Sequence, residues 1–241
     1  MKIVFIGPSL PDATQFATTG TRILPPAEQG DVYRAVSKGA AVIGIVDGLF
    51  EHVAPVWHKE ILYALTRGCS VLGASSMGAL RAVECAPYGM MGIGRIFEEY
   101  RDGIRVDDGD VALQHGPKDI GYAALTVPLV NVDATLANAQ NLGLLSSADA
   151  NHLASVARSI FFKQRTWRRI VQQAELSWDD LQPLIKRSAI DQKRLDAIEL
   201  IRQINGLAAV RNTCPDWIFN ETQAWRELEE NMNNPRFIRS H

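Results

Sequence analysis

The stretch "LGASSMGALRA" contains the two side chains of this sequence that are best placed to act as a nucleophile, Ser75 and Ser76. They stand between an apolar run, "CSVLGA", and a segment with helical spacing. A serine at a strand-to-helix junction can be held on a sharp turn with its hydroxyl exposed, as acyl transfer requires. The same serines can instead be N-caps, and the small residues beside them can simply let a helix pack closely on a sheet.

The neighbours of the two serines favour Ser76 as the nucleophile. A nucleophile on a sharp turn needs small residues two positions before it and two positions after it. Ser76 has Ala74 and Gly78 there, whereas Ser75 is followed at this distance by the larger Met77. The helix that starts after Ser76 would also point free amide groups and the positive end of its dipole at an oxyanion. The candidate oxyanion-binding or substrate-binding residues are Gly7, Ser9, Gly48, Met77 and Gly78.

A serine nucleophile also needs a base, and three histidines are expected near it. His58 ranks first, because it falls in the first turn of a predicted helix and on the face that should cover the sheet. The positive end of the helix dipole would keep its ring neutral, as a base must be. His115 and His52 lie in loops that can reach the same edge, and Asp47 could orient a histidine. His58 could equally be a buried histidine bonded to backbone, and Asp47 could cap its own Asp-Gly turn.

The elements that position these residues alternate between apolar runs and helices. The runs "KIVFI", "AAVIGIV" and "CSVLGA" show no alternation of apolar and polar residues, which is typical of strands buried on both faces, and "TRILPP" is a further short candidate strand. The helices between them, closed by Gly39 and Gly68, predict a Rossmann-like α/β fold with a parallel sheet flanked by helices. The carboxyl ends of such strands meet at one edge, where these folds bind ligands. A further strand, "VALQ", is expected before His115, and "GMMGIGR" is expected to be a loop.

From about residue 131 onward the sequence has helical spacing only. Ser177 and Asp191 are expected to be N-caps of two of these helices. We therefore predict two domains, an α/β core over residues 1–130 and an all-helical C-terminal region over residues 131–241.

The composition predicts a globular protein without the charge that nucleic acids attract. The net charge is −2 and 46% of the residues are hydrophobic, so no nucleic-acid partner is expected. No apolar run is long enough for a membrane span or a signal peptide, which predicts a soluble cytoplasmic protein. The three cysteines lack CxxC spacing, no P-loop pattern is present, and the acidic stretch from Asp107 to Asp110 is expected to be a turn. We expect neither a cofactor nor a metal.

Several long motifs resemble the core of TfuA-like proteins. They occur in order over roughly residues 1–130, as "VFIGPSL", "VIGIVDGLFEHVAPVWHKEILYALTRG", "VLGASSMGALRA" and "GRIFEEYRDG", followed by "DD", "VA" and "HGP". The resemblance implies an accessory role in peptide backbone thioamidation, beside a YcaO-type ATP-dependent enzyme. It also implies sulfur delivery by hydrolysis of the thiocarboxylate on a small ThiS-like carrier protein. The oligomeric state stays open, a homo-oligomer included.

Two functions of different classes follow. In the first, Ser76 attacks the thiocarboxylate, and an incomplete triad suffices because sulfide is a good leaving group. In the second, the chain is a non-catalytic adaptor whose helical half docks the YcaO enzyme and whose strand edge holds the carrier. Small residues would then only permit close approach of the carrier's backbone.

Overall fold

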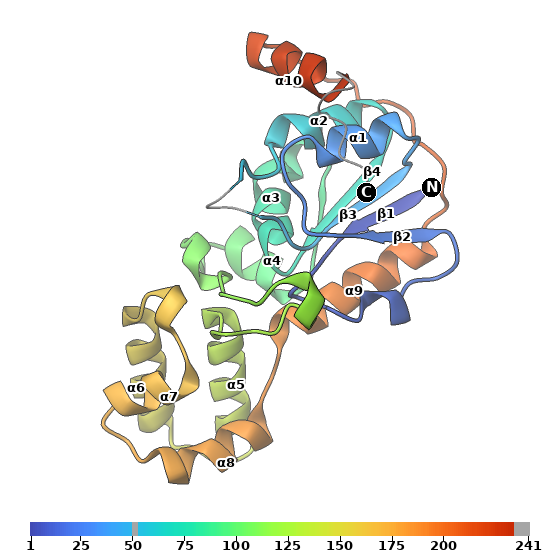
Figure 1. Cartoon of the computed structure of the whole chain (residues 1–241). Coiled ribbons are helices and arrows are strands. Elements are labelled where there is room, and N and C mark those ends of the chain that lie inside the picture. The colour runs from blue at the N-terminus through green and yellow to red at the C-terminus, as the bar shows by residue number, and fades with distance from the viewer. Residues whose placement is uncertain (50–52, 234–241) are drawn as a thin grey trace.

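The computed structural model describes residues 1–49 and 53–233 and contains one parallel sheet (Figure 1). Its strands are β1 (Lys2–Phe5), β2 (Thr21–Leu24), β3 (Val42–Ile45), β4 (Ser70–Ala74) and β5 (Met91–Ile93). They lie in the order β2-β1-β3-β4-β5, and every pair is parallel. Val4, Gly44 and Leu72 stand opposite one another across the three central strands. The predicted α/β fold with a parallel sheet is confirmed.

Helices cover both faces of the sheet, because successive side chains of each strand point to opposite sides. On one face, Ile3, Phe5 and Ile43 pack against buried side chains of α1 (Asp31–Ser37), α2 (His58–Thr66) and α3 (Met77–Cys85). On the other face, Val4 and Val42 pack against α9 (Gln192–Gly206). Gly44 leaves room for this helix, since a Cβ there would lie 2.5 Å from the Cδ1 atom of Ile204.

Two sequence predictions about short elements are wrong. The segment "GMMGIGR" contains the edge strand β5 rather than only a loop, and Gly92 within it makes room for the ring of Phe97. Its three residues are too few to give a periodic signal. The segment "VALQ" forms no strand, and only an isolated antiparallel bridge joins His115 to Ala124.

The C-terminal half is helical, as predicted, and most of it forms a lobe beside the sheet (Figure 1). The lobe consists of α5 (Leu129–Asn141), α6 (Ser147–Ser159), α7 (Trp167–Gln173) and α8 (Trp178–Ser188), which share a hydrophobic core of their own. Ser177 and Asp191 are N-caps, as predicted. From the lobe the chain returns to the sheet through α9, whose buried side chains cover one face of the sheet.

The C-terminal helix α10 (Gln223–Asn233) lies at the far end of the sheet from the lobe, beside α1 and α2 (Figure 1). It is held there by Trp225, whose side chain is fully buried. The indole packs against Tyr33 of α1 and Tyr63 of α2, with ring centroids 5.8 and 5.0 Å apart. No helix in the described part of the chain is long and apolar enough to cross a membrane.

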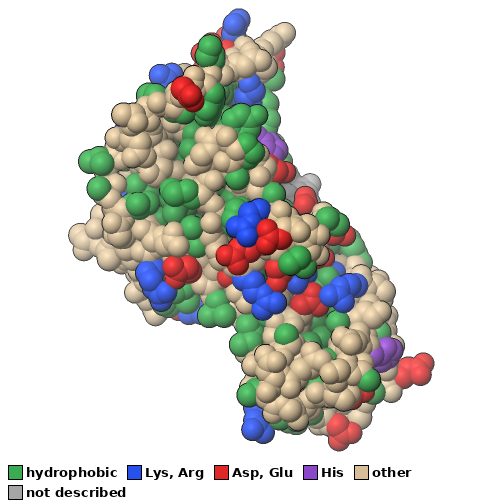
Figure 2. Space-filling model, turned by 180° about the vertical axis from the view of Figure 1, so that it is seen from behind, with side chains coloured by type: hydrophobic (Ala, Val, Ile, Leu, Met, Phe, Trp, Pro, Cys, Tyr) green, Lys and Arg blue, Asp and Glu red, His purple; other side chains and the backbone are tan. Residues whose placement is uncertain are grey.

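Ion pairs join the α/β part to the helical lobe. Arg105, which follows α4 (Arg95–Arg101), pairs with Glu99, with Asp110 and with Asp133 of α5 at 2.5, 3.1 and 2.9 Å. Figure 2 shows acidic and basic side chains gathered at the waist of the molecule. The stretch from Asp107 to Asp110, predicted to be a turn, contains one short 3-10 helix, and Asp107 caps it by accepting from the Gly109 amide. Short 3-10 helices cover Ala13–Gln15, Ala86–Tyr88, Asp108–Asp110, Lys118–Ile120 and Phe162–Gln164.

Candidate active site

The candidate site lies where the order of the strands reverses, between β1 and β3. In open parallel sheets the ligand crevice forms outside the carboxyl ends of the strands at this point. The turn after β1 carries Gly7 and Ser9, the turn after β3 carries Asp47, and the turn after β4 carries the two serines. Because β1, β3 and β4 are neighbours in the parallel sheet, the three turns lie at the same edge, and the turns after β1 and β3 flank the reversal point.

Asp47 holds the turn after β1 in place. The residue is buried, with 2% of its surface exposed. Its Oδ2 atom accepts hydrogen bonds from the amides of Gly7 and Ser9, each at 2.9 Å, and its Oδ1 atom accepts from the Ser9 hydroxyl at 2.6 Å. These three donors satisfy a buried charge that would otherwise be costly. The amides of Gly7 and Ser9 are thus occupied by Asp47, so neither is a free oxyanion donor.

The hydroxyl of Ser76 lies beside a buried lysine. Nζ of Lys193, in the first turn of α9, is 3.1 Å from Oγ of Ser76 and 2.9 Å from the carbonyl oxygen of Val111. Lys193 is 3% exposed and Ser76 is 8% exposed. A neutral amine in this position can donate to Val111 and accept the proton of Ser76 through its lone pair. The pair therefore has the geometry of a nucleophile and its base.

The surroundings of Lys193 favour the neutral amine. Burial lowers the pKa of the ammonium group below its ordinary value, because the charged form loses its hydration. The negative charges of Asp47 and Asp191 act in the opposite direction. A buried lysine with a lowered pKa is the form of this side chain that serves as a general base. Asp47 would then stabilise the ammonium that forms once the amine has taken a proton.

Ser75 has a different place from Ser76. It is fully buried, and its Oγ donates to the backbone carbonyl oxygen of Lys193 at 2.6 Å. Its backbone has φ +65°, a left-handed conformation that is strained in a residue with a side chain. The sharp turn is therefore at Ser75, which fixes α9 to the turn, while Ser76 presents its hydroxyl to the lysine.

The small residues around the serines also serve close packing. A Cβ on Gly78 would collide with the carbonyl oxygen of Ile45, and one on Gly73 would collide with the carbonyl oxygen of Gly78.

The Gly78 amide donates to the carbonyl oxygen of Val46 at 3.1 Å, so it is not a free oxyanion donor. The Met77 amide, at the start of α3, bonds to no acceptor among the described residues. Within residues 1–49 and 53–233, the amide of Gly48 also bonds to no acceptor.

The comparison with protein families identifies the chain. Residues 47–166 match the family model described as TfuA-like protein. The chain belongs to the TfuA-like family. Membership is consistent with an accessory role in thioamidation, in YcaO-linked systems. No curated protein matches the chain.

The histidines of this TfuA-like protein bond elsewhere. Nε2 of His58 lies 2.7 Å from a carboxylate oxygen of Glu84 and 3.3 Å from Nη1 of Arg81, and its side chain is 41% exposed. Nδ1 of His115 lies 2.7 Å from the carbonyl oxygen of Gly116. Neither ring hydrogen-bonds to a serine hydroxyl in the described structure, and His52 lies outside the described residues. A histidine base for Ser76 stays a prediction from the sequence, whereas the lysine has the contact.

Sequence reasoning missed Lys193, although α9 carries a signal for it. The buried positions Ala197, Leu200, Ile201 and Ile204 follow Lys193 at helical spacing and face the sheet. A lysine on such an apolar stripe must be buried, and buried lysines are rare unless they are paired or used. That stripe could have marked Lys193 as a candidate base.

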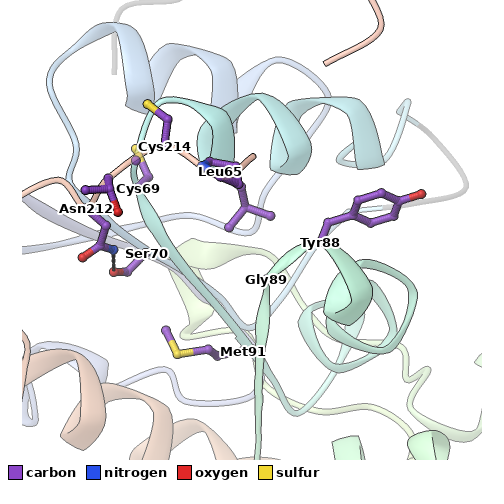
Figure 3. A pocket seen from close by; sticks show the side chains of 11 residues that line it. Leu65, Cys69, Ser70, Tyr88, Gly89, Met91, Asn212 and Cys214 are labelled. Carbon is purple, nitrogen blue, oxygen red and sulfur yellow. Dashed lines mark hydrogen bonds between the residues drawn. The ribbon is translucent and has the colours of Figure 1, made fainter. Parts of the chain in front are cut away.

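The cysteines of this TfuA-like protein lie away from the serines. A cavity of about 320 Å³ at the opposite edge of the sheet is lined by Cys69, Cys214 and Ser70, the first residue of β4 (Figure 3). Burial raises the pKa of the Cys69 thiol and raises that of Cys85 to about 11. Thiols that stay protonated are weak nucleophiles, so these two cysteines are poor candidates to carry sulfur.

Proposed function

We propose that this TfuA-like protein hydrolyses the thiocarboxylate of a small ThiS-like carrier protein and releases sulfide for a YcaO-type enzyme. The observation that supports this most is the Ser76–Lys193 pair, with 3.1 Å between Oγ and Nζ. A serine and a lysine of lowered pKa are sufficient for acyl transfer, since the amine can both take and return a proton.

In the proposed first step, Lys193 takes the hydroxyl proton of Ser76, and Oγ attacks the carbon of the thiocarboxylate. The amides of Met77 and Gly48 are the donors best suited to the oxygen of the tetrahedral intermediate. The carbon–sulfur bond then breaks, and the leaving sulfur takes the proton from the Lys193 ammonium. This step yields an ester of Ser76 and one hydrosulfide ion.

In the second step, a water molecule hydrolyses the ester that the carrier has formed with Ser76. Lys193 removes a proton from a water molecule, which attacks the ester carbon. The ester bond breaks, the Lys193 ammonium returns its proton to Ser76, and the carrier leaves with an ordinary carboxylate. The second proton of the water is released and converts the hydrosulfide of the first step to hydrogen sulfide. Over both steps, one thiocarboxylate and one water give one carboxylate and one hydrogen sulfide.

The direct test uses the purified protein alone with thiocarboxylated carrier. Sulfide is measured by a colorimetric assay, and the mass of the carrier is measured to detect the replacement of sulfur by oxygen. We expect both products to appear in equal amounts at a rate far above that of the carrier alone. The carrier with an ordinary C-terminal carboxylate is the control, and it should give no sulfide.

The adaptor function is the alternative, and one observation favours it. Gly73 and Gly78 are explained by contacts within the protein, so the small residues alone require no chemistry. If the protein releases no sulfide but increases thioamide formation by the YcaO enzyme, the adaptor function replaces the hydrolase. Retained stimulation by Ser76→Ala would support that outcome.

A further inference from the structure

A tyrosine from a separate segment reaches the candidate site. Tyr122 lies on a loop that folds back on itself through the His115–Ala124 bridge and a 2.8 Å hydrogen bond from the Gly116 amide to the Ala123 carbonyl. Its backbone has φ +54°, a conformation that is strained in a tyrosine. Strain of this kind is maintained where the surrounding structure requires it, and it often occurs at functional sites.

The phenol end of Tyr122 stands at the point where the strand order reverses. Its Cζ atom, which carries the hydroxyl, is 3.2 Å from the position that a Cβ on Gly7 would occupy. The amide of Gly7 is itself 2.9 Å from Oδ2 of Asp47. A side chain at Gly7 would crowd the phenol ring, so its absence leaves room for Tyr122 beside the turn that Asp47 holds.

The hydroxyl of Tyr122 is free to serve a ligand. The side chain is half-buried, and its oxygen hydrogen-bonds to no other residue within the described part of the chain. Burial, together with the charge of Asp47, raises the pKa of the phenol. At neutral pH the group is therefore an O–H donor and not an anion.

In the proposed reaction, the sulfur atom of the substrate carries negative charge and requires a hydrogen-bond donor. A thiocarboxylate is ionised at neutral pH, so attack by a serine places negative charge on oxygen and on sulfur at once. Two backbone amides can stabilise the oxygen, but the sulfur needs a donor of its own. A site built on backbone amides alone would serve neutral acyl groups equally well.

We propose that the Tyr122 hydroxyl donates a hydrogen bond to the ionised sulfur of the substrate and so selects a thiocarboxylate over neutral acyl derivatives. This inference rests on the proposed function, because it assigns a partner to the leaving sulfur of that reaction. The ring itself is held by an edge-on contact with His115, with centroids 5.6 Å apart. Removal of the hydroxyl alone therefore leaves the packing of the ring in place.

The first experiment compares Tyr122→Phe with the wild-type protein on two substrates. The substrates are the thiocarboxylated carrier and the same carrier as a neutral C-terminal ethyl ester. We expect kcat/KM to fall about 10- to 100-fold on the thiocarboxylate and less than threefold on the ester. Tyr88→Phe is the matched control, since Tyr88 is exposed at the opposite edge of the sheet, and it should change neither value. Equal losses on both substrates, or no loss, would overturn the inference.

The second experiment does not depend on turnover. In the Ser76→Ala background, dissociation constants are measured for carriers that end in a thiocarboxylate or in a neutral carboxamide. We expect the Ser76→Ala protein to bind the thiocarboxylate more tightly than the carboxamide. Addition of Tyr122→Phe should reduce this ratio of dissociation constants about tenfold. Equal affinities in the Ser76→Ala protein, or an unchanged ratio after addition of Tyr122→Phe, would refute the role of Tyr122. Absence of sulfide release by the wild-type protein would refute the hydrolase function instead.

Discussion

Lys193 is the residue on which the chemistry of the proposed site depends. A histidine, as expected from the sequence, would have needed a carboxylate or a backbone group to orient its ring. The lysine is oriented by its helix and by the bond to Val111, and it needs only burial to become neutral. Asp47 is then free to organise the turn after β1, which is where its three hydrogen bonds go.

This role of Lys193 predicts the pH dependence of sulfide release. Only the neutral amine can take the Ser76 proton, and burial lowers the pKa of the amine. The rate should therefore rise with pH through that lowered pKa and reach a plateau below the ordinary value of 10.5. Lys193→Met and Lys193→Arg should each lose about a thousandfold in kcat/KM at every pH, because neither has a neutral amine. A pH profile shared by wild type and Lys193→Met would contradict the role.

At the scale of elements, α3 and the turn before it depend on glycine. The helix starts so close to β3 that the Gly78 amide bonds to Val46 and a Cβ at Gly78 would strike Ile45. This contact places the start of α3 against the sheet edge and so places the Ser76 hydroxyl. Close packing and a nucleophilic serine are therefore compatible explanations of the same small residues.

Gly78→Ala tests that packing. The added methyl group meets backbone rather than a flexible side chain, so the strand and helix must move apart. We expect the free energy of unfolding, measured in urea, to fall by about 2–3 kcal/mol. Gly206→Ala is the control, because a Cβ there meets nothing within 4 Å, and it should be neutral or stabilising by a few tenths of a kcal/mol. Equal stability of the two variants would show that α3 can shift without cost.

The sequence predicts the regular elements better than the site. Continuous apolar runs closed by glycines were enough to predict the parallel sheet and the edge that carries Asp47 and the serines. β5 was missed because three residues carry no periodicity, and "VALQ" was predicted as a strand because apolar residues in a turn resemble one. Lys193 was missed because its contact with Ser76 joins residues 117 positions apart, which only tertiary packing brings together.

At the scale of the whole molecule, the site depends on both halves of the chain. Ser76 comes from the sheet, whereas Lys193 comes from α9, and Asn131 of the helical lobe accepts a hydrogen bond from the Lys193 amide. The family match ends at residue 166, so it includes the serine and not the lysine. At the other end of the sheet, α10 covers α1 and α2 and has no contact with this pair in the described hydrogen bonds and ion pairs.

Trp225→Ala separates stability from chemistry. The indole is fully buried among aromatic rings of α1, α2 and the segment before α10, so its loss should lower the free energy of unfolding by about 3–5 kcal/mol. Sulfide release below the melting temperature should stay within about twofold of wild type, because the Ser76–Lys193 contact is untouched. Trp217→Ala, at a half-buried tryptophan, should cost less stability. A large loss of turnover in folded Trp225→Ala would mean that α10 takes part in the reaction.

Sulfide release by Ser76→Ala, measured beside Ser75→Ala with thiocarboxylated carrier, tests the central claim most directly. We predict that Ser76→Ala loses about a thousandfold or more in kcat/KM, because the nucleophile is gone. Ser75→Ala should lose roughly tenfold, because its hydroxyl only anchors the carbonyl of Lys193. Circular dichroism and melting temperatures would establish that both variants are folded. Release of sulfide at the wild-type rate by folded Ser76→Ala would contradict the account.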